Sequence, residues 1–275
     1  MAILKADLHL HSTQSDGSLS PAKLIACAAA LGIEVLSFTE HDTMQGFAAA
    51  EEAAIRRGIR LIPGVELSTI DPSTGRKVHI LGYGIKDPQS IEAACSPLQK
   101  QKNEAAAIMV DELRKLGYPL DLADVAAYAG KTGILYRQHV MHALCDRGYE
   151  TAIYGKLYQR LYHTAFSMNL RYMSSSEAVK LIAAAGGLAV LAHPYQYDSL
   201  ASIPELITHG LKGMEVFYPG YNQRQRKGLL DLVRQHHLFV TGGSDAHGLY
   251  SEKAQPLGCT KFDLERSHPL LLGSR

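Results

Sequence analysis

The chain has 275 residues, of which 46% are hydrophobic and 20% charged, a composition typical of a globular protein with a large buried core. Its formal net charge of +1 excludes a protein whose affinity comes mainly from wrapping long nucleic acid, but it allows a local basic pocket. No membrane span, signal-peptide pattern or CxxC pair is present in the sequence. We therefore expect a cytoplasmic protein with reduced cysteines and no membrane contact.

Short apolar runs predict seven strands, which alternate with helical patterns along much of the chain. The strands are expected at residues 6–11, 34–41, 60–68, 78–84, 187–194, 213–219 and 238–245. Helices are expected at 20–32, 45–57, 178–185 and 222–236. The first begins with Ser20 and Pro21, and Ser174 with Glu177 forms a capping-box pattern before the third. This alternation predicts an α/β fold, a distorted seven-stranded TIM-like (βα)7 barrel.

The third and fourth predicted strands are connected differently from the others. Roughly nine residues, including Asp-Pro-Ser-Thr-Gly at 71–75, join them, which is too short for a helical crossover. We therefore expect an antiparallel hairpin. The start of the fourth strand would then lie beside the end of the third.

Residues 86–173 interrupt the alternation with helical patterns at 98–116, 122–129, 138–147 and 154–162. We interpret this segment as a helical insertion over the mouth of a barrel formed by residues 1–85 and 174–275. Residues 131 to 171 include six Lys or Arg residues but only two acidic residues. Six of the chain's 14 tyrosines lie between residues 131 and 172. The insertion would therefore place positive charge and aromatic rings above the site.

Six histidines, two aspartates and one glutamate lie at or near the ends of the predicted strands. They are His9, His11, Asp16, His41, Glu66, His79, His193, Asp245 and His247. Sites in parallel barrels assemble at the carboxyl ends of the strands, and the hairpin would bring His79 to the same rim. Imidazole and carboxylate groups bind the divalent metals of hydrolytic enzymes, and nine such groups exceed what one ion needs. A single histidine is more often structural, but the whole set predicts a multinuclear metallohydrolase.

The motifs around these residues resemble those of the PHP (polymerase and histidinol phosphatase) family. They are Asp-Leu-His-Leu-His-Ser at 7–12, Ser-Asp-Gly at 15–17, Thr-Glu-His-Asp at 39–42, Gly-Val-Glu at 64–66, Val-His-Ile-Leu-Gly-Tyr at 78–83, Ala-His-Pro at 192–194 and Gly-Ser-Asp-Ala-His at 243–247. The chain is most similar to the stand-alone phosphoesterases of the family, which act on nucleoside 3',5'-bisphosphates or as 5'-to-3' exoribonucleases. These have an inserted helical domain with an Arg-x-His element, seen here at 137–139.

The resemblance implies three divalent metal ions, for which this ligand chemistry does not choose among Mn, Fe and Zn. It assigns His9, His11, Glu66 and Asp245 to the first ion. Glu66 would bridge to a second ion held by His79 and His193, and Asp16, His41 and His247 would hold the third. Asp7 is expected to orient one of the ligand imidazoles.

The resemblance also implies attack on phosphorus by a hydroxide that bridges two metal ions. Arg137 is expected to contact the phosphate, and His139 to protonate the leaving oxygen or to make a further phosphate contact. Arg171 and His163 are further candidates for substrate contacts. The chain departs from its subfamily at two substrate-facing segments, 167–172 in place of Gly-x-Pro and Tyr-Gln-Tyr at 195–197 in place of Gly-Arg-Tyr.

The leading hypothesis is a metal-dependent phosphoesterase acting on a nucleoside bisphosphate or a short 5'-phosphorylated oligonucleotide. Its partner would be a small phosphorylated substrate, a nucleotide or short RNA, and its oligomeric state stays open. One alternative is a histidinol-phosphate phosphatase, whose smaller substrate gives a basic, tyrosine-containing insertion less to bind. Others are a non-catalytic module stabilised by metal and a hydrolase of C–N bonds.

Overall fold

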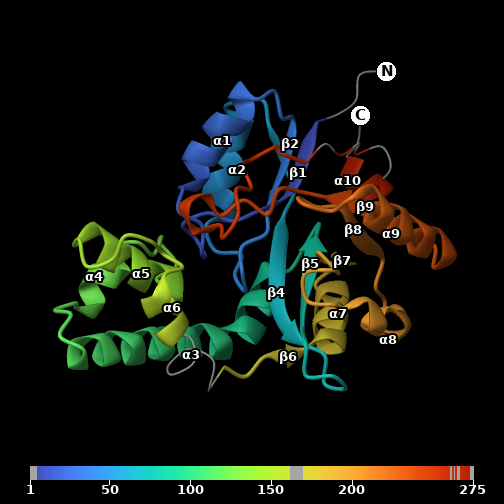
Figure 1. Ribbon diagram of the computed structural model, residues 1–275. Coiled ribbons are helices and arrows are strands. Elements are labelled where there is room, and N and C mark those ends of the chain that lie inside the picture. Colours follow the sequence, from blue (N-terminus) through green and yellow to red (C-terminus); the bar gives the residue numbers. More distant parts are fainter. Residues whose placement is uncertain (1–4, 162–169, 261, 263, 265–266, 273–275) are drawn as a thin grey trace.

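A computed structural model describes residues 5–161, 170–260, 262, 264 and 267–272 (Figure 1). Its strands are β1 (Ala6–Leu10), β2 (Val35–Phe38), β3 (Arg60–Leu61), β4 (Gly64–Ile70), β5 (Lys77–Tyr83), β6 (Met173–Ser174), β7 (Leu188–Leu191), β8 (Gly213–Phe217) and β9 (Phe239–Gly242). Its α-helices are α1 (Pro21–Ala30), α2 (Phe47–Ile55), α3 (Pro88–Lys115), α4 (Leu122–Ala126), α5 (Arg137–Asp146), α6 (Lys156–Leu161), α7 (Ser175–Ala184), α8 (Ile203–Thr208), α9 (Gln223–Gln235) and α10 (Pro269–Leu272). The fold is mixed α/β, as predicted.

The strands form two sheets. A parallel three-stranded sheet has the order β1-β2-β3, and a six-stranded sheet has the order β6-β4-β5-β7-β8-β9. Within the larger sheet β5 is antiparallel to both β4 and β7, while the other pairs are parallel. The hairpin predicted between the third and fourth apolar runs is therefore confirmed, with Ser68 paired to His79.

Two short seams connect the sheets. At the first, Leu10 and Ala246 form an isolated parallel bridge, and the amide of Asp245 donates to the carbonyl of His9 over 2.8 Å. At the second, His41 and Glu66 form the bridge. Residues with ligand-type side chains thus lie on both sides of each seam, which brings the rims of the two sheets to one place.

The count of seven strands is not confirmed in the part of the chain that the structure describes. The predicted strand at 60–68 is divided into β3 and β4 around Pro63, which has no backbone N–H for a sheet hydrogen bond. Gly64 follows, and a Cβ atom there would lie 2.2 Å from the Ser37 hydroxyl. The strand β6, which pairs with β4, was also not predicted.

Several helix starts follow from local capping that the sequence indicates. Ser20 accepts a hydrogen bond from the amide of Lys23 at the start of α1, and Ser174 with Glu177 forms the predicted capping box of α7. The helix α3 is longer than its prediction of 98–116, because Asp87 caps it ten residues earlier and Pro97 is accommodated inside it.

The buried apolar side chains form three clusters. One lies between the six-stranded sheet and helices such as α7, and a second packs α1 and α2 against β1, β2 and β3. The third consists of residues between 105 and 161, from α3 to α6. The helix α3 joins two of these cores, because Ile91 and Cys95 pack in the first and Ala106 and Met109 in the third. No helix in the described part of the chain is both long and apolar enough to cross a membrane.

Candidate metal centre

Glu66 on β4 lies at the centre of a cluster of imidazoles. Its Oε1 atom is 2.8 Å from His79 Nδ1 and 2.9 Å from His193 Nε2. Its Oε2 atom is 3.1 Å from the Nε2 atoms of both His9 and His11. Glu66 is fully buried. Its one carboxylate on β4 contacts imidazoles from β1, from β5 and from the ends of β1 and β7.

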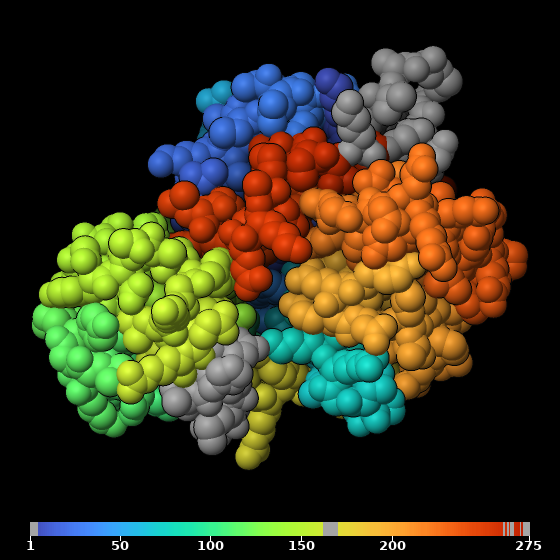
Figure 2. All heavy atoms as spheres, viewed as in Figure 1, coloured from blue at the N-terminus to red at the C-terminus, as the bar shows by residue number. Residues whose placement is uncertain are grey.

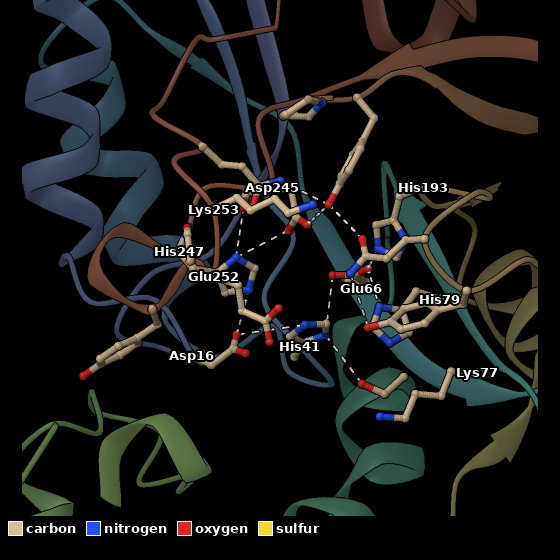
Figure 3. A pocket seen from close by; sticks show the side chains of 18 of the residues that line it. Asp16, His41, Glu66, Lys77, His79, His193, Asp245, His247, Glu252 and Lys253 are labelled. Atoms are coloured by element: carbon tan, nitrogen blue, oxygen red, sulfur yellow. Dashed lines mark hydrogen bonds and ion pairs between the residues drawn. The ribbon is translucent and has the colours of Figure 1, made fainter. Parts of the chain in front are cut away.

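Two aspartates complete the cluster on the side of the β1–β9 seam. Asp245 Oδ1 lies 3.3 Å from His9 Nε2 and 3.2 Å from His11 Nε2. Asp16 Oδ1 lies 3.3 Å from His247 Nε2 and 3.8 Å from His11 Nδ1. Figure 3 shows the labelled members of this set pointing toward one another around a common space.

Three groups of these side chains place a ligand atom from each member within 4.8 Å of the others. The first group, His9, His11, Glu66 and Asp245, is the first predicted set. The second, His11, Asp16, His41 and His247, contains the third predicted set and adds His11. The third, His41, Glu66 and His79, differs from the remaining predicted set by having His41 in place of His193. His193 still lies beside the Glu66 carboxylate.

The spacing of these atoms fits a bound divalent metal better than a hydrogen-bond network. Metal bonds of about 2.0–2.1 Å at tetrahedral angles place two ligand atoms roughly 3.3 Å apart, and the distances from Asp245 Oδ1 to His9 and His11 have this length. Both ring nitrogens of His11, Oδ1 of Asp16 and Oδ1 of Asp245 are buried without a hydrogen-bond partner. Buried polar atoms of this kind need a ligand, so the residues fit the metals that the sequence predicts.

The charges within the cluster shift its pKa values strongly. Burial alone would lower the pKa of His11, but the nearby carboxylates of Asp245 and Glu66 raise it to about 10. Burial dominates at His41 and lowers its pKa to about 3. Burial opposes ionisation of Glu66, yet the surrounding imidazoles hold the pKa of this carboxyl well below its usual value. The carboxylates are therefore anionic and require nearby positive charge.

Glu215 on β8 is a supporting residue that the sequence analysis missed. It is fully buried, and its Oε1 atom lies 3.0 Å from His9 Nδ1 while its Oε2 atom accepts from the amide of His193 over 2.9 Å. It therefore orients two members of the cluster. A single glutamate inside the apolar strand Gly-Met-Glu-Val-Phe at 213–217 was the available signal.

Asp7 does not have the role expected for it. Its carboxylate accepts hydrogen bonds from the backbone amides of Ser244 over 2.8 Å and Gly258 over 2.9 Å, rather than from a ligand imidazole. Asp7 Oδ1 also lies 3.4 Å from the amide of His9. Asp7 thus fixes the backbone on both sides of the β1–β9 seam.

A cavity of about 620 Å³ opens above the cluster. Figure 2 shows the hollow between the helical part of the chain, the segment near residue 250 and the segments that follow β7 and β8. Cluster members, tyrosines and a few cations line it, including Glu66, His79, Arg137, Tyr197, Tyr218, Lys77 and Lys253. Tyr197 belongs to the 195–197 segment that was expected to face the substrate, whereas Lys77 and Tyr218 were not identified from the sequence as site residues.

The four predicted substrate contacts differ in their placement. Arg137 lines the cavity, with its guanidinium carbon 5.5 Å from the centre of the Tyr158 ring. His139 is fully buried behind the wall, where its Nδ1 atom accepts from the amide of Tyr136 at the start of α5. Arg171 is exposed and does not line the cavity, and its amide donates to the Gln101 side chain. His163 lies outside the described residues.

Comparison with known proteins agrees with this geometry. The family model of the PHP domain matches residues 7–153. The chain belongs to the PHP family. A phosphoribosyl 1,2-cyclic phosphate 1,2-diphosphodiesterase of Eggerthella lenta is 37% identical over 89% of this chain and 94% of its own length. A 5'-3' exoribonuclease of Haemophilus influenzae is 34% identical over 88% of this chain and 90% of its own.

A solved structure also matches nearly the whole chain of this PHP protein. It is an amidohydrolase from Chromobacterium violaceum with bound sulfate and no metal, with a TM-score of 0.79 and 28% identity over 97% of this chain and 94% of the other. A 3',5'-nucleoside bisphosphate phosphatase from the same species is 31% identical over 88% of this chain and 86% of its own. Together with the cluster, these relatives identify this PHP protein as a metal-dependent phosphoesterase.

Proposed function

We propose that this PHP protein uses three divalent ions to hydrolyse a phosphate ester of a ribose-containing nucleotide. The observation that carries the proposal is the position of Glu66, which lies within 3.1 Å of four imidazole nitrogens at the floor of the cavity. The nine cluster residues would hold the ions, with His11, His41 and Glu66 each shared between two groups. The native ions would be Mn, Fe or Zn.

The chain's own residues supply binding, orientation and charge. Ions bound at such a cluster lower the pKa of water and neutralise a phosphoryl group. Arg137 offers a planar set of donors that matches two phosphate oxygens, and it lines the cavity. In the net reaction the P–O bond to the leaving alcohol breaks and water is added across it. Phosphate leaves from a monoester, and a shortened oligonucleotide from a diester.

His139 suits a positioning role better than proton transfer. Burial lowers its pKa to about 4, so the ring is neutral at pH 7 and has no extra proton to give. The ring instead caps the first turn of α5, where Arg137 is the first residue. We propose that His139 sets the direction of Arg137, and that Arg171 is at most a peripheral contact.

We also propose that the two sheets together form the distorted barrel of the family, joined at the Leu10–Ala246 and His41–Glu66 bridges. Residues 86–173 would be its helical insertion. A hydrophobic cluster made only of residues between 105 and 161 supports this division.

The substrate is the open part of the proposal. The leading candidates are a nucleoside 3',5'-bisphosphate and a short 5'-phosphorylated RNA. A phosphoribosyl cyclic phosphate is a second candidate, favoured by the name of the 37% identical relative. All of them combine a ribose with phosphate. Histidinol phosphate lacks the ribose and would leave much of a 620 Å³ cavity unfilled.

The test is a substrate panel with metal-reconstituted protein: adenosine 3',5'-bisphosphate, 5'-phosphorylated trinucleotide RNA, phosphoribosyl 1,2-cyclic phosphate and histidinol phosphate. Release of phosphate or mononucleotide from a ribose compound, lost in His193→Ala and reduced in Arg137→Ala, would support the proposal. Preference for histidinol phosphate, with Arg137→Ala unchanged, would reject it. Metal binding without turnover of any compound would favour the non-catalytic module.

A further inference from the structure

Lys77, at the start of β5, places a cation in the cavity that the cluster does not use. It lies two residues before His79, so both side chains lie on the same face of the strand (Figure 3). Lys77 is half-buried and lines the cavity. No hydrogen bond or ion pair joins its ammonium group to another residue in the described part of the chain.

The neighbouring cation shows that acidic partners are available nearby. Arg76, the preceding residue, pairs with Asp198 outside the cavity. Asp71, at the other end of the hairpin turn, accepts hydrogen bonds from Ser73 and Ser202. Lys77 lines the cavity, whereas neither of these two acids does. An ammonium group held there without a counter-ion is suited to an anionic ligand.

The position of Lys77 also indicates where that anion would lie. Two residues along a strand span about 6.8 Å of backbone, so the backbone of Lys77 lies about that far from the backbone of His79. Arg137 also lines the cavity, close enough to Tyr197 to affect its pKa, and Tyr197 packs against His79 with ring centres 4.9 Å apart. Lys77 thus lies beside the cluster rather than in it, where a second phosphate of a substrate bound at the cluster would lie.

We infer that Lys77 is a specificity-determining residue that binds the second, non-reacting phosphate of the substrate. This inference rests on the proposed function, because it assumes that the first phosphate reacts at the cluster. It narrows the substrate to small ribose compounds with two phosphoryl groups. It also predicts that selectivity over monophosphates depends on one side chain of β5.

The experiment compares wild type with Lys77→Met, Lys77→Arg and Lys23→Met, all reconstituted with Mn. Lys23 is exposed on α1, away from the cavity, and serves as the control for losing a lysine charge. The substrates are adenosine 3',5'-bisphosphate, adenosine 3'-monophosphate and adenosine 5'-monophosphate. The measured quantity is the ratio of kcat/KM for the bisphosphate to kcat/KM for the better monophosphate.

We expect Lys77→Met to lower this ratio about 10- to 100-fold, mainly through KM, because a hydrogen bond between charged groups contributes roughly that factor to binding. Lys77→Arg should restore most of the ratio, and Lys23→Met should leave it unchanged. An unchanged ratio in Lys77→Met, whether kcat/KM stays the same or falls equally for all substrates, would overturn the inference. Wild type that hydrolyses none of the three adenosine compounds, but another ribose compound of the panel above, would overturn the inference and leave the proposed function standing. Wild type that hydrolyses no compound of either set would contradict the proposed function itself.

Discussion

The floor of the cavity and its helical wall are built in different ways. The floor belongs to the sheet rims, where nearly every polar group is buried and Glu66, Asp245 and Glu215 each contact more than one partner. The helical wall has its own apolar core, and it is joined to the floor by the start of α3, which packs into the sheet core, and by polar contacts. A rigid floor can fix the reacting groups, while a wall attached at few points can vary with the substrate.

One group of contacts between the two regions lies on the turn at His41 and Asp42. Lys102 of α3 pairs with Asp42 over 2.7 Å, and both side chains are buried. Gln99 donates to the carbonyl of Asp42 over 2.7 Å, and the Tyr136 hydroxyl donates to the carbonyl of His41 over 2.9 Å. His41, one of the three residues that belong to two ligand groups, is thus held in place by the helical wall. The following experiments test whether floor and wall can be separated.

Removing the negative charge of Glu66, which two ligand groups share, should have the largest effect on activity. We expect Glu66→Gln to lower kcat roughly 1,000-fold or more, because an amide loses the negative charge that two ligand groups share. The metal content per chain, measured by plasma mass spectrometry, should fall in parallel. Glu104→Gln, at an exposed carboxylate of α3, is the matched control and should retain both. Full metal content with full activity in Glu66→Gln would show that Glu66 is not a ligand.

Breaking the link between wall and floor should mainly affect stability. Lys102→Met leaves the buried carboxylate of Asp42 unpaired, which costs about 3–5 kcal/mol in the free energy of unfolding. Urea denaturation would measure this loss. The double variant Lys102→Met with Asp42→Asn removes both charges and should recover a large part of it. If the single and double variants were equally unstable, the ion pair would not be what connects the wall to this turn.

The sequence indicated the floor far better than the wall. The ligands stand directly at the ends of short apolar runs, so the strand pattern and the hairpin were enough to predict that His79 reaches Glu66. The role of Glu215 was not predicted, because a single acidic residue within a strand produces no periodic pattern. The role of Lys77 was not predicted either, because it depends on the cavity that Lys77 lines. That cavity forms only when β5, the 195–197 segment and α5 come together. The start of α3 is set by the cap at Asp87, which lies well before the apolar pattern at 98–116 that predicts the helix.

The supporting carboxylate of the floor should have a smaller effect than a ligand. We expect Glu215→Gln to weaken metal binding about 10- to 100-fold, because the amide still fills the space but no longer strengthens His9 as a donor. Competition with a coloured chelator would measure the dissociation constant. Activity at saturating metal should recover most of its wild-type value. An unchanged dissociation constant would mean that Glu215 serves only the fold of β8.

The smallest effect is expected outside both regions, at the turn of the hairpin that carries Lys77 and His79. Burial opposes ionisation of Asp71, but hydrogen bonds from Ser73 and Ser202 outweigh it and lower its pKa to about 2 from 3.8. A carboxyl with a depressed pKa stabilises the fold fully above its unfolded value and loses this contribution as the pH falls toward 2. Allowing for solvent screening, the ionised Asp71 carboxylate contributes about 1 kcal/mol to the free energy of unfolding. Urea denaturation should therefore separate wild type from Asp71→Asn above pH 4, and the difference should shrink between pH 4 and pH 2. A difference that stayed constant over this range would assign the stabilisation to the shape of the turn rather than to the charge of Asp71.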